Sequence, residues 1–303
     1  MVTKLLLGVS LSVTVLAAAC GGGEAPTTAT PSVHLTATPS VTQTAEGGAA
    51  ESKAHLQAAT ALHETGRIEE AISEHQQAIS LNREYVEAYR GRAAAYRDLG
   101  QFQRAVQDYD EVVRINPQDP SAYATRGLAY ISLRQYRRAI EDYNEAIRLD
   151  PQNASAYDQR GDIYHALGDY DQAIRDYDAA IRLEYQNNDA YLNRGSAYDE
   201  LGQYELAIQD YDEAILRDPE YAFAYSNRGF TYYQLGQLDR SVQDTSEAIR
   251  LNPQFANPYA IRAHAYTLLG DDSEAQLDVD RAAALGIDRG ILEAEIKELK
   301  NLR

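Results

Sequence analysis

Apolar and small side chains recur along most of this chain with the spacing of helix faces. In residues 120–153, one stripe contains Tyr123, Gly127 and Tyr130, as expected for a helix with one buried side. A second stripe consists of Tyr136, Ala139, Ile140, Tyr143 and Ile147. A short break at 133–135 separates the stripes, and Pro151 follows the second one. The pattern predicts a pair of helices joined by a tight turn.

The same pattern returns every 34 residues without a gap. Tyr123 recurs as Tyr89, Tyr157, Tyr191, Tyr225 and Tyr259, and Ala139 recurs as Ala71, Ala105, Ala173, Ala207 and Ala275. Seven copies fit, at residues 52–85, 86–119, 120–153, 154–187, 188–221, 222–255 and 256–289. A lone helical hairpin cannot bury both of its faces, so the copies are expected to stack into a solenoid with one continuous core.

The repeated pattern resembles that of the tetratricopeptide repeat (TPR) family. At these offsets it has an aromatic residue, glycine, tyrosine, alanine, a second aromatic residue and proline. The resemblance implies an all-α, right-handed superhelical solenoid of seven hairpins. The seventh repeat is followed by a predicted last helix at 290–303, and Asp288 can cap its N-terminus. The apolar face of this helix would contain Leu292, Ile296, Leu299 and Leu302. We expect this helix to close the solenoid.

The first residues have a different character. Residues 1–19 carry one positive charge at Lys4 and then an apolar run that ends in small residues before Cys20. This stretch resembles a bacterial lipoprotein signal peptide, which implies that Cys20 becomes a lipid-bearing N-terminus outside the cytoplasm, anchored to a bacterial membrane. The alternative is an uncleaved membrane helix, but the apolar run is shorter than the roughly 20 residues that span a bilayer. Cys20 is the only cysteine, so no intramolecular disulfide is possible.

Residues 20–51 are rich in Thr, Pro, Ala and Gly and show no apolar period. Such a segment cannot bury enough apolar surface to fold. We therefore predict a disordered tether between the lipid and the repeats, with a reach of roughly 30 Å.

One position departs from the family pattern, because arginine replaces the usual leucine before the glycine. The six arginines are Arg92, Arg126, Arg160, Arg194, Arg228 and Arg262. Six aspartates lie at one fixed offset from them, namely Asp108, Asp142, Asp176, Asp210, Asp244 and Asp278. The first repeat lacks both residues, which suggests structural ion pairs, formed within or between repeats. The alternative is a basic groove.

In the family, residues one, five and eight places after the recurrent tyrosine of the first helix line the concave face. The resemblance implies a partner-binding groove that contains Arg90, Arg97, Leu128, Ile131, Asp158, Asp162, His165, Asp199, Phe230 and Tyr233, with Phe223 on the same helical stripe as the last two. The groove would begin basic, become apolar and then acidic, and end in an aromatic patch. Phe223, Phe230 and Tyr233 are the preferred site, and the alternative is that they fill a gap left by Ser241 and Thr245.

The charge of the chain and the absence of catalytic motifs in its sequence limit the classes of function that we expect. The formal net charge of −18 disfavours nucleic acid and favours a partner with a basic segment. The chain contains no phosphate-binding loop, zinc-protease motif or dinucleotide fingerprint, so we expect neither catalysis nor a cofactor.

The leading hypothesis is a membrane-anchored, extracytoplasmic scaffold that binds a protein or peptide in its concave groove, in envelope or appendage assembly. Two alternatives remain open. One is a receptor for a small ligand or metal held by Asp158, Asp162 and His165. The other is a structural protein that self-associates through the aromatic patch.

Overall fold

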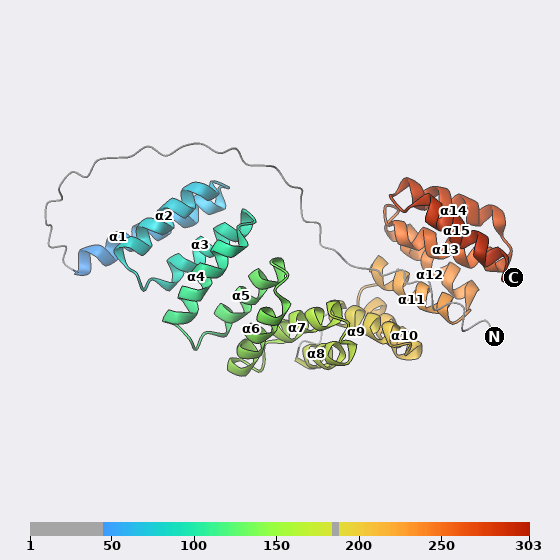
Figure 1. Ribbon diagram of the computed structural model, residues 1–303, viewed down its shortest axis with the longest axis horizontal. Helices are drawn as coiled ribbons and strands as arrows, with labels where there is room; N and C mark the ends of the chain where they lie inside the picture. The colour runs from blue at the N-terminus through green and yellow to red at the C-terminus, as the bar shows by residue number, and fades with distance from the viewer. Residues whose placement is uncertain (1–44, 184–187) are drawn as a thin grey trace.

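The computed structural model describes residues 45–183 and 188–303, and these residues form fifteen α-helices and no strand (Figure 1). Fourteen helices pair in chain order into seven hairpins. The pairs are α1 (Ala45–Glu64) with α2 (Ile68–Leu81), α3 (Val86–Asp98) with α4 (Phe102–Ile115), α5 (Pro120–Ser132) with α6 (Tyr136–Leu149), α7 (Ala154–Ala166) with α8 (Tyr170–Leu183), α9 (Asn188–Glu200) with α10 (Tyr204–Arg217), α11 (Ala222–Gln234) with α12 (Leu238–Leu251), and α13 (Ala256–Leu269) with α14 (Asp272–Ala284). The last helix is α15 (Arg289–Lys300). The predicted all-α solenoid of seven hairpins and a C-terminal helix is confirmed.

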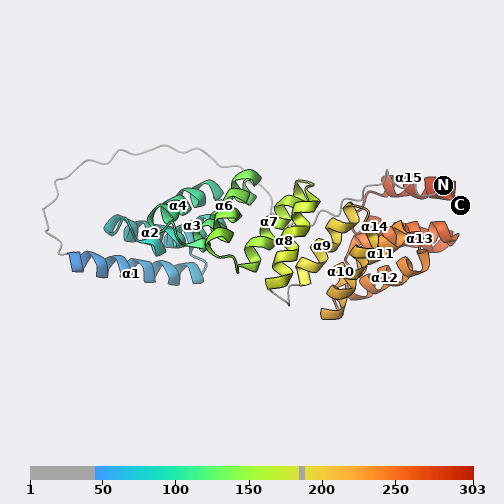
Figure 2. The same ribbon diagram turned by 90° about the horizontal axis from the view of Figure 1, so that it is seen from below.

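The hairpins stack in chain order into an elongated, curved array (Figures 1 and 2). Each hairpin packs on its immediate neighbours, and among the helices that the structure describes the contacts are between elements close in chain order. The fold is therefore held together by contacts within hairpins and between adjacent ones.

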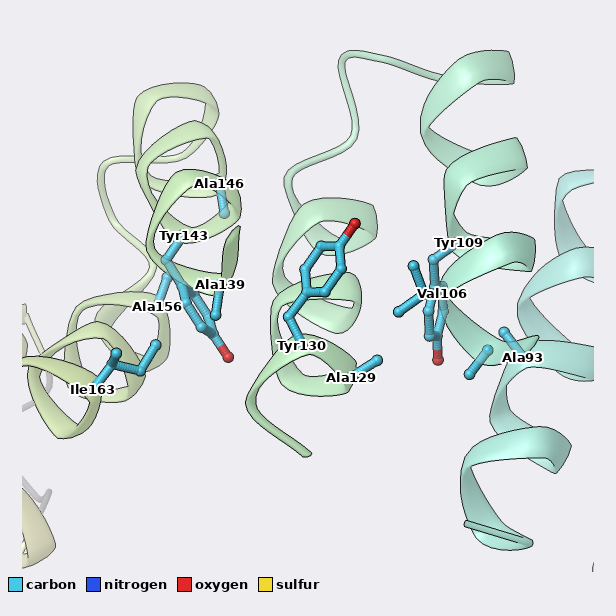
Figure 3. Close-up of a cluster of buried hydrophobic side chains, with 11 residues drawn as sticks. Ala93, Val106, Tyr109, Ala129, Tyr130, Ala139, Tyr143, Ala146, Ala156 and Ile163 are labelled. Carbon is cyan, nitrogen blue, oxygen red and sulfur yellow. The ribbon is translucent and has the colours of Figure 1, made fainter. Parts of the chain in front are cut away.

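A close approach between glycine and tyrosine fixes each central hairpin. The ring of Tyr143 on α6 lies 3.0 Å from the point where a Cβ on Gly127 would stand, and Tyr143 is only 1% exposed. Tyr177 and Tyr211 pack in the same way on Gly161 and Gly195. Any side chain at these glycines would displace a buried ring, so the recurrent glycine is a packing requirement. Figure 3 shows the resulting core between α3 and α7, with Tyr143 beside Ala139 and Tyr130 on the neighbouring helix.

The turn between the two helices of a hairpin needs one residue in the left-handed region. Glycine serves in most copies, as at Gly100, where φ is 69°. Arg134 takes this position in the third hairpin with φ of 57°, at a cost on the order of 1 kcal/mol.

The two ends of the array differ in detail from the sequence-based boundaries. Helix α1 begins at Ala45, so residues 45–51 of the expected tether are helical. Three predicted features lie outside the described residues, namely the signal segment 1–19, the lipidated Cys20 and the tether up to residue 44. None of the described helices is long and apolar enough to cross a membrane.

The C-terminal helix packs as expected, with one exception. Asp288 caps α15 by accepting a hydrogen bond from the Ile291 N–H at 3.0 Å. The helix buries Leu292, Ile296 and Leu299 against α13 and α14. Leu302, which was expected on the same apolar face, is 49% exposed because the helix ends at Lys300.

Candidate functional site

The six arginines join three helices each. Arg126 on α5 donates from Nε and Nη2 to the Asp142 carboxylate of its own hairpin, at 2.9 and 2.6 Å. Its Nη1 donates to Asp110 of the preceding hairpin at 2.8 Å. The guanidinium also lies over the rings of Tyr123 and Tyr130. The hydrogen bonds that Arg126 donates to Asp142 raise the pKa of Arg126.

All six expected arginine–aspartate pairs have this geometry, and we call the set the arginine ladder. The pairs are Arg92 with Asp108, Arg126 with Asp142, Arg160 with Asp176, Arg194 with Asp210, Arg228 with Asp244, and Arg262 with Asp278. The arginine side chains are only 12 to 19% exposed, so they do not form the alternative basic groove.

The second partner of each arginine was missed by the sequence reasoning. It lies 16 residues earlier, on the second helix of the preceding hairpin. These residues are Gln76, Asp110, Asn144, Asp178, Asp212 and Ser246. Each has a side-chain oxygen that can accept a hydrogen bond. This shared property is visible in the sequence and could have predicted the contact with the arginine. Ion pairs therefore form within every one of these six hairpins, and three of the arginines, Arg126, Arg194 and Arg228, also pair with an aspartate of the preceding hairpin.

The first helices of adjacent hairpins, which carry the expected groove residues, approach one another unevenly. Helix α7 contacts α9, α9 contacts α11, and α11 contacts α13. These contacts are most extensive between α11 and α13, weaker between α7 and α9, and weakest on the two sides of α5. The first helices are therefore packed most closely in the C-terminal part of the expected groove and least closely around α5.

Hydrogen bonds close the face between α7 and α9. The Asp162 carboxylate on α7 accepts from the Tyr177 hydroxyl at 2.9 Å and from Asn193 Nδ2 on α9 at 3.1 Å. His165 lies 3.4 Å from the Ser196 hydroxyl of α9 and packs edge-on against Tyr170. Burial raises the pKa of Asp162 to about 6 and lowers that of His165.

A second carboxylate joins α9 to α11. Asp199 accepts hydrogen bonds from the Tyr211 hydroxyl at 2.8 Å and from Thr231 Oγ1 on α11 at 2.8 and 2.9 Å. Burial raises the pKa of Asp199 to about 7. Within the described part of the chain, neither Asp162 nor Asp199 forms an ion pair with a basic side chain.

The expected aromatic patch is largely interior. Tyr233 is 7% exposed and packs with Phe230 against Ile261 and Ala265 of the next hairpin. Phe223 is 39% exposed, but it lies near the start of α11 with its ring on Phe255, 4.8 Å between centroids. For Tyr233, packing between α11 and α13 is the structural role, because these helices are close together. The three side chains do not form one exposed surface.

Apart from Phe223, the exposed residues of the predicted groove lie on the N-terminal side. Arg97 is exposed at the end of α3, and Leu128 on α5 is 36% exposed. Ile131 and Asp158 are half-buried. Arg90 pairs with Asp119 and donates to the Ser121 hydroxyl at 2.9 Å, so it is fixed at the edge of the face.

A buried hydroxyl on this side has no partner. Tyr143 is equivalent to Tyr177, whose hydroxyl donates to Asp162. One period before Asp162 stands Leu128, which has no acceptor. The Tyr143 hydroxyl is consequently buried without a hydrogen bond.

Asp158, Asp162 and His165 do not form a metal centre. In the part of the chain that the structure describes, no group of three His, Cys, Asp or Glu side chains is placed to hold a metal ion. Asp162 Oδ1 instead accepts hydrogen bonds from a hydroxyl and an amide donor.

Three family models match the chain, and together their matches span residues 59–255. A model described as TPR repeat matches 59–97, 93–133 and 127–168, and two models described as tetratricopeptide repeat match 159–225 and 222–255. No curated protein sequence matches the chain significantly.

Solved structures share the fold. A tetratricopeptide repeat protein from Parabacteroides merdae is 19% identical with a TM-score of 0.64, covering 83% of this chain and 99% of that one. A MamA structure is 27% identical with a TM-score of 0.51, covering 53% and 94%. YrrB, described as a TPR protein with an unusual peptide-binding site, is 21% identical with a TM-score of 0.53, covering 62% and 97%.

Proposed function

Because this chain belongs to the tetratricopeptide repeat family, we propose that it is a non-catalytic scaffold that binds a polypeptide on the first-helix face of α3, α5 and α7. The observation that carries the proposal is the reduced contact of α5 with its two neighbouring first helices. Leu128 and Arg97 are exposed there, whereas side-chain hydrogen bonds join α7 to α9 and α9 to α11 on the equivalent face. YrrB, which has the same fold, has a peptide-binding site, and this supports a similar use of the fold here.

Leu128→Ser is expected to weaken peptide binding about tenfold, because an apolar contact at the centre of the face is lost. A random peptide library is panned against the full-length chain, and the enriched peptides are titrated by fluorescence anisotropy. Leu216→Ser is the matched control, since Leu216 is 75% exposed on the second helix α10. It should bind the enriched peptides like the wild type. Equal affinities for Leu128→Ser and wild type would place the site elsewhere.

We further propose that the scaffold is held outside the cytoplasm by a lipid on Cys20, with residues 1–19 removed. The support is the sequence alone, namely the short apolar run and the small residues before Cys20. A lipid with two or more acyl chains gives stable attachment, whereas one chain is marginal. A place in envelope or appendage assembly follows as part of this proposal, because the repeats would then meet partners at the membrane surface.

Cys20→Ser is expected to move the protein from the membrane fraction to the soluble fraction, because it removes the lipidation site. The measurement is fractionation of cells by ultracentrifugation, followed by immunoblotting. Metabolic labelling with an alkyne fatty acid supplies the control, since label should be present on the wild type and absent from the variant. A Cys20→Ser protein that still sediments with membranes would contradict the anchor.

The partner is proposed to carry a basic segment. The chain has a formal net charge of −18, and Asp158 and Asp162 lie on the proposed face. Opposite charge on a partner would speed association and select against acidic competitors.

A further inference from the structure

We infer that the facing sides of the first helices α5 and α7, called the α5–α7 gap below, form a subsite for one cationic side chain of the partner, a lysine or an arginine. The inference rests on the proposed function, because it names the chemistry recognised on the same face. Its support is an apolar side on α5, an acidic side on α7 and a buried hydroxyl without a hydrogen bond.

The repeat register shows which residues face each other across the gap. Between α7 and α9, His165 lies 3.4 Å from Ser196. The equivalent positions one period earlier are Ile131 on α5 and Asp162 on α7. The repeat register therefore pairs an apolar side chain on α5 with a carboxylate on α7, and Leu128 stands one turn before Ile131 on the same helix face.

The Asp162 carboxylate has no basic side chain paired with it among the residues that the structure describes. The Asp162 carboxylate is held by two neutral donors, Tyr177 and Asn193, and forms no ion pair within the described residues. The charge of Asp189 also acts on Asp162 and disfavours its ionised form. A partner's ammonium or guanidinium group would supply the positive charge that this site lacks.

The Tyr143 hydroxyl gives independent support for a ligand. Tyr143 is 1% exposed, and its hydroxyl has no hydrogen-bond partner. Burial raises the pKa of Tyr143, and the negative charge of Asp162 raises it further, so the hydroxyl lies within electrostatic reach of that carboxylate. A buried hydroxyl without a partner costs stability, and a ligand group that bonds to it would recover that loss.

A long basic side chain fits this combination better than other residues do. The methylene groups of lysine or arginine can lie on Leu128 and Ile131 while the charged end reaches Asp162. The neighbouring gaps do not offer this chemistry. Asp162 and Asp199 themselves bridge the next two gaps, and on α3 the equivalent of Ile131 is the cationic Arg97.

The test uses the full-length chain and four fluorescein-labelled peptide pools. One central position of each pool is fixed as Lys, Arg, Leu or Glu, and the other positions are randomised. We expect the Lys and Arg pools to bind about tenfold more tightly than the Leu and Glu pools. Asp158→Asn combined with Asp162→Asn should abolish that difference. The charge-matched control is Glu141→Gln combined with Asp171→Asn, two exposed residues on second helices, and it should preserve the difference.

Tyr143→Phe provides a second variant that keeps the core intact, because it removes only a hydroxyl that has no partner. It should weaken binding of the Lys pool about threefold while leaving the melting temperature unchanged or higher. Equal losses in both double variants would mean general charge attraction and would overturn the subsite. If the Leu pool binds as well as the Lys pool and Leu128→Ser abolishes both, the binding face stands and the cationic subsite falls. If no pool binds, both proposals fall.

Discussion

Arg160→Leu is expected to destabilise the protein by about 3 to 5 kcal/mol, although it restores the residue that the family usually has. The reason is Asp176, whose side chain is 7% exposed and accepts two hydrogen bonds from Arg160 at 2.6 and 2.8 Å. Without the guanidinium, a carboxylate would remain buried with no cation. The Asn144 side chain of the preceding hairpin would lose its donor as well. Urea denaturation followed by circular dichroism measures the loss.

Two controls separate burial of charge from loss of side-chain volume. The double variant Arg160→Leu with Asp176→Leu removes both charges, so it should recover most of the lost stability. Arg67→Leu breaks an ion pair with Glu70 in which both side chains are more than half exposed, and it should leave the unfolding midpoint nearly unchanged. An Arg160→Leu protein as stable as the Arg67→Leu variant would show that the arginine ladder contributes little to the fold.

Most of the fold could be predicted from the sequence, because the same pattern of apolar positions occurs seven times. Each copy predicts a helix pair by its own apolar period, and the fixed spacing of Arg160 and Asp176 indicates their pairing before any coordinates are considered. The contact of Arg160 with Asn144 was missed, since the equivalent positions vary among Asp, Asn, Gln and Ser. The property that they share is an acceptor oxygen, and a search for identical residues does not detect it.

The candidate site could be predicted only in part. A periodic pattern indicates that Leu128, Phe230 and Tyr233 belong to one face of the first helices, but it does not give the distance between adjacent helices. That distance depends on particular contacts, such as the hydrogen bond from Asn193 to Asp162 and the packing of Tyr233 on Ile261. These contacts bury Tyr233 and leave Leu128 exposed. Within the predicted aromatic patch only Phe223 is exposed, so its three side chains do not present one exposed surface.

Asp199→Asn is expected to stabilise the protein at pH 8, because it removes a buried carboxylate that has no cation beside it. Burial raises the pKa of Asp199 to about 7 in the folded protein, whereas an unfolded chain has a value of about 4. A shift of this size corresponds to roughly 2 to 4 kcal/mol, allowing for partial solvent access. The asparagine can still accept hydrogen bonds from Tyr211 and Thr231, so the link between α9 and α11 remains.

The pH dependence follows from the sign of that shift. A carboxyl with a raised folded pKa favours folding below the unfolded value, near pH 4, and this contribution is lost as the pH rises through about 7. The wild type and Asp199→Asn should thus have similar stabilities at pH 4 and diverge up to pH 8, with the variant above. His75, whose pKa burial lowers to about 4, titrates in both proteins, so the difference between their curves isolates Asp199. Asp171→Asn, at an exposed position on α8, should leave the wild-type curve unchanged in shape. The prediction is tested by measuring urea unfolding midpoints across this pH range. Parallel curves for Asp199→Asn and wild type would contradict it, because they would mean that Asp199 is solvated and that the face between α9 and α11 is open to water.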